Sequence, residues 1–153
     1  MSTATKPQPA GVNFATVAPK PRMLFLNLPV KDLQRSMQFF AKLGFSFNPQ
    51  FTDETAAAML VGKDAFVMLL SQPRFKDFVN RPVADPRAAT GALFTFSADS
   101  REEVDQIVKT AVANGGSHAK DPQDHGFMYG WSFYDPDGHH WEVFWMDQAA
   151  VQK

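Results

Sequence analysis

The stretch YDPDGHHWEVFW, Tyr134 to Trp145, places a turn directly in front of a run in which polar and apolar residues alternate. Pro and Gly stand at the second and fourth positions of DPDG, as a type I turn favours. Alternation is typical of a strand, whose successive side chains point to opposite faces. His140 and Glu142 therefore share one face, and Trp141 lies on the other. We predict a hairpin whose last strand carries a histidine and an acid on the same face.

The residues before this hairpin predict a complete structural unit. LFTFSA from Leu93 indicates a strand, and Ser100 followed by Glu103 has the spacing of a helix-capping box. An apolar stripe follows at helical spacing, and NGG at 114–116 ends the helix. SHAKDP and FMYGWSFY then indicate two further strands before the last one. The apolar stripe consists of Val104, Ile107, Val108 and Ala111.

The same order of elements occurs earlier in the chain. RMLFLNLPV (Arg22 to Val30) indicates a buried strand, Asp32 is an N-cap candidate, and Gly44 stands where the following helix would end. Aligning Asp32 with Ser100 superimposes the two helices, so one strand–helix–three-strand unit occurs twice. The three short strand candidates of this first unit begin at Phe45, Thr55 and Asp64.

This repetition predicts the fold class. Each unit is a sheet with one helix on one face, so two tandem βαβββ modules predict an α+β protein with a curved eight-stranded sheet and helices outside. The concave inner face, the trough, is a natural small-molecule site. We expect a domain over 22–147, with some helix in its linker around Phe75 to Val79. Its parts are an N-terminal flexible tail over 1–21, module one over 22–72, the linker over 73–90, module two over 91–147 and a C-terminal tail over 148–153.

The composition excludes several classes of protein. The chain has 153 residues, a formal net charge of −1 and a pI near 6.4, so it is not basic enough to favour nucleic acid or an anionic membrane surface as a partner. It contains no cysteine, which excludes disulfides, thiolate metal sites and a cysteine nucleophile. No apolar run approaches the ~20 residues of a membrane span. We expect a cytoplasmic protein.

Two of these motifs resemble a known superfamily. LPVKDLQRSMQFFAKLGF and DPDGHHWEV are similar to the first-helix and last-hairpin signatures of the vicinal oxygen chelate superfamily. Glyoxalase I, extradiol dioxygenases, and fosfomycin- and bleomycin-resistance proteins belong to that superfamily, as do many glyoxalase-like proteins. The resemblance spans about Arg22 to Asp147. It implies paired βαβββ modules, a small-molecule ligand and a homodimer.

The resemblance also implies where a metal would bind. Enzymes of this superfamily usually hold one divalent ion in the trough, with His, Gln or Glu ligands from the first and last strands of each module. The matching positions here are Phe25, Leu93 and Glu142, and a fourth that falls on Leu69 if the register is right. Because one carboxylate cannot complete a divalent coordination set, we expect no cofactor. If Ni, Zn, Mn or Fe is bound in an active enzyme, Glu142 and His140 are the ligands we expect.

The candidate site combines these positions with their neighbours in the trough. Glu142 is the catalytic candidate, although it could instead bond a neighbouring backbone group or hydroxyl. His140 could cap the hairpin, and Trp131 could pack in the core. Both histidines outside the hairpin are expected near the surface, and the two aspartates of DPDG are expected to shape the turn. The ligand-binding candidates are Asn27, His140, Phe25, Leu69, Leu93 and Trp131.

Two functions follow from this set of residues. The first is a glyoxalase-like small-molecule-binding protein with a degenerate metal site, which binds an apolar or aromatic ligand in the trough. The alternative is a metal-dependent lyase, isomerase or dioxygenase of the glyoxalase superfamily. The apolar residues at the metal-ligand positions favour binding. The intact DPDGHHWE motif, which carries Glu142, favours the enzyme.

Overall fold

The first half of the chain forms a four-stranded sheet. In the computed structural model, which describes residues 8–12 and 20–150, the strand order is β1-β4-β3-β2. β1 runs parallel to β4, and the other pairs are antiparallel. α1 (Leu33–Lys42) connects β1 to β2, and a short 3₁₀ turn, η1 (Pro49–Phe51), follows β2. The strands are β1 (Leu24–Val30), β2 (Ser46–Asn48), β3 (Ala56–Gly62) and β4 (Ala65–Ser71).

The second half repeats this arrangement. Its strand order is β5-β9-β8-β6, with β5 parallel to β9 and the other pairs antiparallel, and β7 adds a short pairing to β8. α3 (Arg101–Ala113) connects β5 to β6, and a 3₁₀ turn, η2 (Gln148–Ala150), follows β9. The α+β fold and its internal repeat are thus confirmed. The strands are β5 (Leu93–Ser97), β6 (Ser117–His118), β7 (Gln123–Asp124), β8 (Met128–Tyr134) and β9 (His140–Met146).

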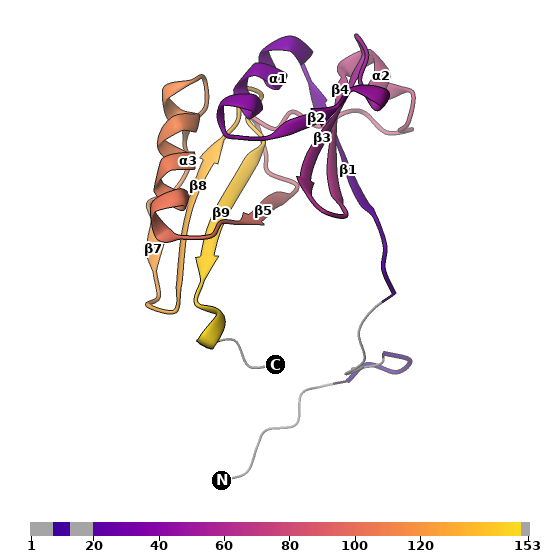
Figure 1. Ribbon diagram of the computed structural model, residues 1–153. Helices are drawn as coiled ribbons and strands as arrows, with labels where there is room; N and C mark the ends of the chain where they lie inside the picture. Colours follow the sequence, from indigo (N-terminus) through magenta and orange to yellow (C-terminus); the bar gives the residue numbers. More distant parts are fainter. Residues whose placement is uncertain (1–7, 13–19, 151–153) are drawn as a thin grey trace.

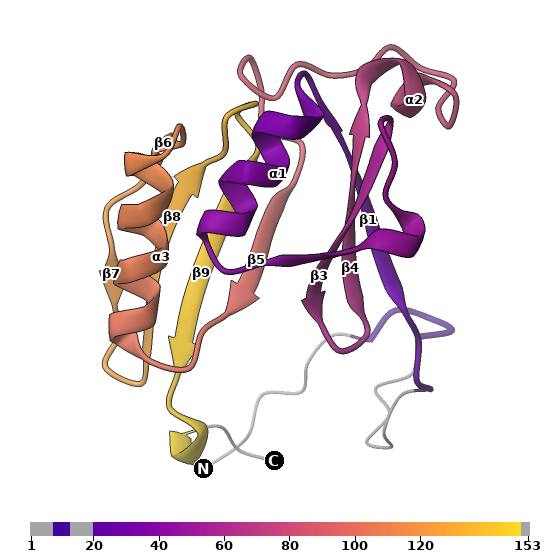
Figure 2. The ribbon, with the colours of Figure 1, turned by 45° about the horizontal axis from the view of Figure 1, so that its top comes forward.

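The two halves do not share one continuous sheet. Among the described residues β1 pairs only with β4, and β5 only with β9. Two separately hydrogen-bonded sheets therefore stand side by side, with α1 between them and α3 on the outer side of the second sheet (Figures 1 and 2). We call the junction between the two sheets the seam.

Both long helices begin and end as their sequences indicate. The Asp32 carboxylate accepts the backbone N–H of Arg35 at 3.1 Å, and the Ser100 hydroxyl accepts that of Glu103 at 3.1 Å. Such caps satisfy donors that the first helical turn leaves free. Gly44, which follows α1, has a φ of +102°, a conformation that glycine adopts without steric cost.

The core joins the two halves through α1. Phe40 is fully buried, and its ring lies 5.1 Å from the ring of Trp141 on β9. Phe39 likewise lies 6.0 Å from Phe133 on β8. The same helix packs on its own sheet, where Leu69 is fully buried. Each large side chain buried in this way contributes about 1.5–3 kcal/mol, so the two modules stabilise one another.

The linker between the sheets differs from its sequence-based description. Its helix, α2 (Gln72–Lys76), begins directly after β4 and overlaps the helix expected around Phe75 to Val79 only at Phe75 and Lys76. The Ser71 hydroxyl caps this helix, and a proline stands in its first turn, where the missing N–H is tolerated. The chain then runs without regular structure across the top of Figure 2 to β5, over the seam.

Smaller differences concern the short strands. The strand expected from Phe45 is three residues long and continues into η1, whose first residue is a proline, and the strand expected in SHAKDP has two residues. β7 was not expected from the sequence. Within the described ranges no helix is long and apolar enough to cross a membrane. Most of the predicted N-terminal tail, and the last three residues of the C-terminal one, lie outside the described residues.

Candidate ligand-binding site

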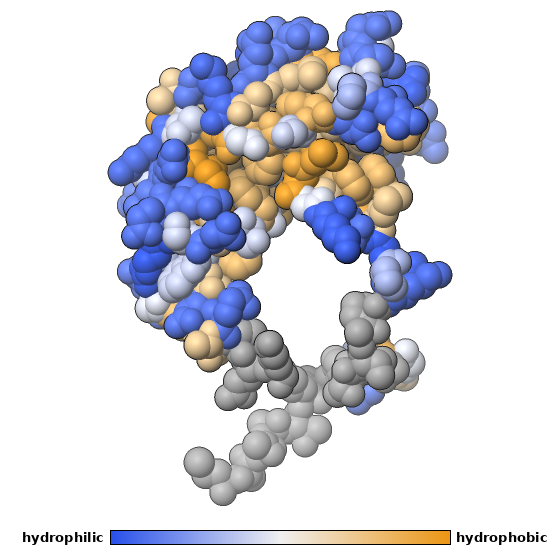
Figure 3. All heavy atoms as spheres, in the orientation of Figure 1, coloured by the Kyte–Doolittle hydropathy of each residue, from blue (hydrophilic) through white to orange (hydrophobic). Residues whose placement is uncertain are grey.

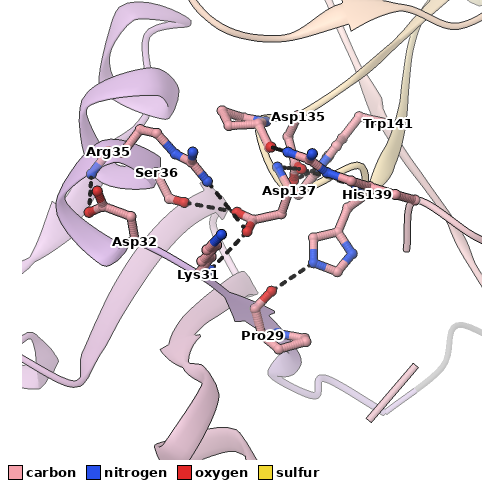
Figure 4. A network of polar contacts seen from close by, with 11 residues as sticks. Pro29, Lys31, Asp32, Arg35, Ser36, Asp135, Asp137, His139 and Trp141 are labelled. Atoms are coloured by element: carbon pink, nitrogen blue, oxygen red, sulfur yellow. Dashed lines mark hydrogen bonds and ion pairs between the residues drawn. The ribbon is translucent and has the colours of Figure 1, made fainter. Parts of the chain in front are cut away.

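The DPDG turn between β8 and β9 is docked on the start of α1 (Figure 4). The Asp137 carboxylate accepts the backbone N–H of Lys31 at 2.8 Å and the hydroxyl of the buried Ser36 at 3.3 Å. The guanidinium of Arg35 lies 3.6 Å from the same carboxylate. One aspartate of the last hairpin therefore fixes the junction between β1 and α1.

Asp135 organises the turn from inside. One of its carboxylate oxygens accepts the backbone N–H groups of Asp137 at 2.9 Å and His139 at 3.0 Å, and the other accepts the indole N–H of Trp141 at 3.0 Å. Burial raises the pKa of the Asp135 carboxyl, although the neighbouring His139 opposes this change. A ring nitrogen of His139 also lies 2.8 Å from the carbonyl oxygen of Pro29 on β1 (Figure 4). These contacts give the motif a structural role.

The strand registers identify equivalent positions in the two modules. Phe25 lies opposite Phe66 and Leu93 lies opposite His140; two residues further on, Met68 and Glu142 take the corresponding places on β4 and β9. Met68, and not Leu69, is therefore the residue of module one that corresponds to Glu142. The prediction for Leu69 is wrong by one residue. Neighbouring residues of a strand point to opposite faces, so Leu69 points away from the face of Met68. Its side chain is fully buried in the core.

The residues at the superfamily's ligand positions do not fit a divalent ion. The ring of Phe25 stacks on that of Phe66, with 4.7 Å between centroids, and Leu93 and Met68 offer no nitrogen or oxygen donor. Glu142 supplies a carboxylate without such partners. Within 8–12 and 20–150, no three His, Cys, Asp or Glu side chains are grouped closely enough to hold a metal.

The seam contains a cavity of about 340 Å³, which we call the seam pocket. Asn27 of β1 and His140 of β9 line it from the two sheets. The roof is formed by the linker residues Val83, Ala84, Pro86, Ala89, Thr90, Gly91 and Ala92. No Asp, Glu, Lys or Arg is among the residues that line it, although His139 and His140 are. Figure 3 shows apolar surface gathered in the middle of the molecule, between the two sheets, with hydrophilic surface at the periphery. The apolar side chains of the pocket include Phe75, Val83 and Phe94.

His140, one of the residues that line this pocket, carries an unsatisfied polar atom. Its Nε2 is buried and has no hydrogen-bond partner among the described residues. Burial lowers the pKa of the imidazole, and the nearby Glu142 carboxylate opposes this change without reversing it. The ring is therefore neutral at neutral pH. Its centroid lies 5.1 Å from that of Tyr134.

Glu142 lines a second, smaller hollow of about 110 Å³, the inner pocket. Ser132, directly opposite on β8, shares it, and so do Lys120 and His125 from the segment between β6 and β8. Lys120 lies near enough to His140 for its charge to contribute to lowering the pKa of that imidazole. The structure thus brings Asn27 and His140 together in the seam pocket and places Glu142 beside them in the neighbouring hollow.

The remaining candidates lie elsewhere. Phe25 and Leu93 are 45% and 47% exposed on the inner face, outside the lining of both pockets. Trp131 borders the inner pocket, but it lies opposite Val143 and packs against the core. The sequence did not reveal that the segment between the modules lines the seam pocket, with Phe75 of α2 and Val83 of the roof. The available signal was these apolar residues in a segment interpreted as a linker.

The repeated sheet, the outer helix and the pocket at the seam define a class of two-module α+β proteins with a cavity between the modules. A family model described as Glyoxalase/Bleomycin resistance protein/Dioxygenase superfamily matches residues 22–143. The chain belongs to this superfamily. No curated protein matches the chain by sequence.

Solved structures share the fold. A hypothetical protein from S. aureus is 26% identical, with a TM-score of 0.69 over 82% of this chain and 94% of that one. A glyoxalase/bleomycin resistance protein/dioxygenase family enzyme from Burkholderia phytofirmans PsJN is 16% identical, with a TM-score of 0.68 over 82% and 99%. A lactoylglutathione lyase from Agrobacterium tumefaciens is 18% identical, with a TM-score of 0.60 over 88% and 100%. At the identities of the last two, the likeness concerns the fold alone.

Proposed function

We propose that the protein binds an apolar or aromatic small molecule between its two modules without a metal ion. The observation that carries this proposal is that apolar side chains occupy positions where the resemblance to the superfamily places metal ligands. Phe25 stacks on Phe66 there, and Leu93 stands in the other module. Both Phe25 and Leu93 are nearly half exposed, so a ligand that covers them gains about 25 cal/mol for each Å² of apolar surface removed from water.

Metal analysis of protein purified without a histidine tag tests this proposal. We expect substoichiometric metal, and no change in melting temperature on addition of EDTA or of Ni²⁺, Zn²⁺, Mn²⁺ or Fe²⁺. A hydrophobic dye or aromatic probe should bind and raise the melting temperature, because ligands that bind only the folded state stabilise it. About one tightly bound ion per chain, whose removal lowers the melting temperature, would overturn the proposal.

A second candidate function is a metal-dependent lyase, isomerase or dioxygenase. The observation that favours it is the position of Glu142, which shares the inner face of β9 with His140 and lines the inner pocket with His125. Glu142→Gln distinguishes the two functions because it removes the charge and keeps the shape. On the binding proposal this variant is unaffected by EDTA, as is the parent. A chelator-sensitive parent with an insensitive, less stable variant would favour the enzyme.

We also propose that the protein is a homodimer. On the side of the seam each sheet ends in a strand with one unpaired edge among the described residues, β1 or β5. Leu24, Phe25 and Leu93 are exposed at these strands, and exposed apolar edges are usually covered in native proteins. Light scattering at micromolar concentration should give twice the chain mass. A mass near 17.0 kDa would contradict the proposal.

A further inference from the structure

Another hollow, next to the seam pocket, differs from it in charge. We call this cavity of about 860 Å³ the basic hollow. The start of α1, α2, the linker and the DPDG turn all contribute to its walls. It adjoins the seam pocket, with which it shares Pro29 of β1 and three residues of the roof. Its charged lining residues are four bases, Lys31, Arg35, Lys76 and Arg87, and two acids, Asp85 and Asp137.

The acids of the basic hollow neutralise its bases only in part. The side chain of Asp137 is 8% exposed, and its carboxylate accepts the backbone N–H of Lys31 and lies 3.6 Å from the guanidinium of Arg35 (Figure 4). Asp85 accepts the backbone N–H of Arg87 at 3.0 Å. Four bases less two acids leave a formal charge of +2 in this hollow, although the net charge of the whole chain is −1.

Three of the bases have no acidic partner in the part of the chain that the structure describes. Lys31, Lys76 and Arg87 form no ion pair there. The guanidinium of Arg87 donates from Nη2 to the carbonyl oxygen of Pro136 at 2.7 Å, which fixes its position without cancelling its charge. Like charges that line one hollow repel each other, and this repulsion costs stability. An anion bound among them would remove that cost.

The two bases at the start of α1 also oppose the dipole of the helix. Lys31 precedes the N-cap Asp32, and Arg35 lies in the first turn, which contains no acid. The N-terminus of a helix carries a partial positive charge, so it disfavours cations and favours anions. The dipole therefore gives no reason for bases at this position, whereas it adds to the attraction that they exert on an anion.

We propose that the basic hollow binds the phosphate group of a small molecule. A phosphate monoester carries a charge of about −1.5 to −2 near pH 7, which matches the hollow better than a single carboxylate does. Guanidinium groups hold phosphate oxygens through paired N–H donors, and lysines add point charges. The volume of about 860 Å³ also leaves room for the rest of a phosphorylated molecule. This site is separate from the seam pocket and does not depend on the proposed function.

Isothermal titration calorimetry of the full, untagged chain at pH 7.5 tests the proposal with three sodium salts at equal ionic strength. These are pyrophosphate, phosphate and acetate, whose charge decreases in that order. We expect the affinity to decrease in the same order, with acetate at least about tenfold weaker than phosphate. Equal affinities for phosphate and acetate would refute the assignment to phosphate.

A double variant, Lys31→Gln with Lys76→Gln, removes two charges from the hollow and keeps two long polar side chains. Both lysines are exposed, so we expect the variant to fold as the parent does. Pyrophosphate should bind it about tenfold more weakly, because two charge contacts are lost. The matched control is Lys63→Gln with Lys109→Gln, which removes as many charges from exposed lysines outside the hollow. Its affinity should fall by less than about twofold, because distant exposed charges are screened.

Nuclear magnetic resonance locates the bound anion on the parent protein. The backbone N–H signals of Lys31, Arg35 and Arg87 should be among those that shift most during titration with pyrophosphate. Binding that leaves these signals in place, or that both double variants weaken equally, would put the anion elsewhere and overturn the proposal. The absence of binding at about 10 mM pyrophosphate would overturn it as well. None of these outcomes affects the binding of an aromatic probe, so this proposal and the proposed function fail separately.

Discussion

The inner faces of the two modules have the same backbone register and different chemistry. Phe66 and Met68 occupy in module one the places that His140 and Glu142 occupy in module two. Module one therefore presents an aromatic, apolar wall, and module two presents the ionisable groups. The comparison teaches that the strand pleat, repeated in both modules, fixes which positions face the trough, whereas the residue types decide what those positions can do.

The modules differ in chemistry but are mechanically one unit, and Phe40→Ala tests this most strongly. Removing the fully buried ring takes away contacts with Trp141 in the other module and leaves a cavity. We expect a loss of about 3–5 kcal/mol in the free energy of unfolding, measured by urea denaturation, with one cooperative transition. Phe51→Ala, at a residue 61% exposed, should cost less than about 1 kcal/mol. Two separated transitions in the parent would show that the modules fold independently.

The Asp135 carboxylate gives the next largest effect, because it holds the hairpin of module two in its docked shape. In Asp135→Asn one oxygen can still accept both backbone N–H groups, but the new NH₂ faces the indole N–H of Trp141. We expect a loss of about 1–3 kcal/mol near pH 4, from one orphaned buried donor. Asp121→Asn, in an almost fully exposed side chain, is the control and should change stability little.

The pH dependence of this pair follows from the raised pKa of Asp135. A carboxyl whose folded-state pKa lies above its ordinary value of 3.8 binds its proton more tightly when folded. Its stabilising contribution is therefore complete below that value and is lost as pH rises through the folded-state pKa. The free energy of unfolding of the parent, relative to that of Asp135→Asn, should therefore fall as the pH rises from 3.8 through the folded-state pKa. An advantage for the parent that grows with pH would contradict the direction of the shift.

Gly138→Ala should have a smaller effect, confined to the roof that covers the seam. The φ of Gly138 is +95°, and an added Cβ would meet Arg87 at 2.7 Å, so strain and steric conflict combine. We expect a loss of about 1–2 kcal/mol. Gly126→Ala separates the two causes, because its φ is +80° but open space surrounds the site of its Cβ. A cost no greater for Gly138→Ala than for this control would show that the linker does not press on the hairpin.

The smallest effects come from exchanging equivalent side chains between the modules. His140→Phe removes an unsatisfied buried nitrogen and should leave the free energy of unfolding unchanged or raise it by up to about 1 kcal/mol. Phe66→His, the reverse change in module one, disrupts the stack on Phe25 and should cost about 1 kcal/mol. Thermal melts at pH 7.5 measure both. Equal costs for the two variants would argue against this assignment of apolar and polar walls.

Local signals explain why the helices and the repeat could be predicted from the sequence. The stripe in α1, its Asp32 cap and Gly44 all act within a few residues, and the structure places them as expected. Leu69 was misplaced because AFVMLL is apolar throughout, so its composition does not show which residues face the core. The pairing of β1 with β4, which places Phe66 opposite Phe25, decides which residues of β4 face the inner side.

The candidate site depended more strongly on long-range contacts. Alternation along the last strand correctly put His140 and Glu142 on one face, but it gave no sign that a linker would close a cavity over Asn27. That closure depends on Arg87 meeting the DPDG turn about fifty residues later, a contact that no local pattern encodes. The docking of Asp137 on Lys31 joins residues still further apart in sequence.

The position of α1 at the seam bears on how the protein comes into being on the ribosome. Phe39 and Phe40 are synthesised early, whereas the rings that cover them, Phe133 and Trp141, emerge about a hundred residues later. At the usual ~5–20 residues per second, the nascent first module spends several seconds or more with an aromatic face bare. Premature termination before β9 would leave that face exposed permanently. Such a fragment would be a natural target for chaperones and for aggregation.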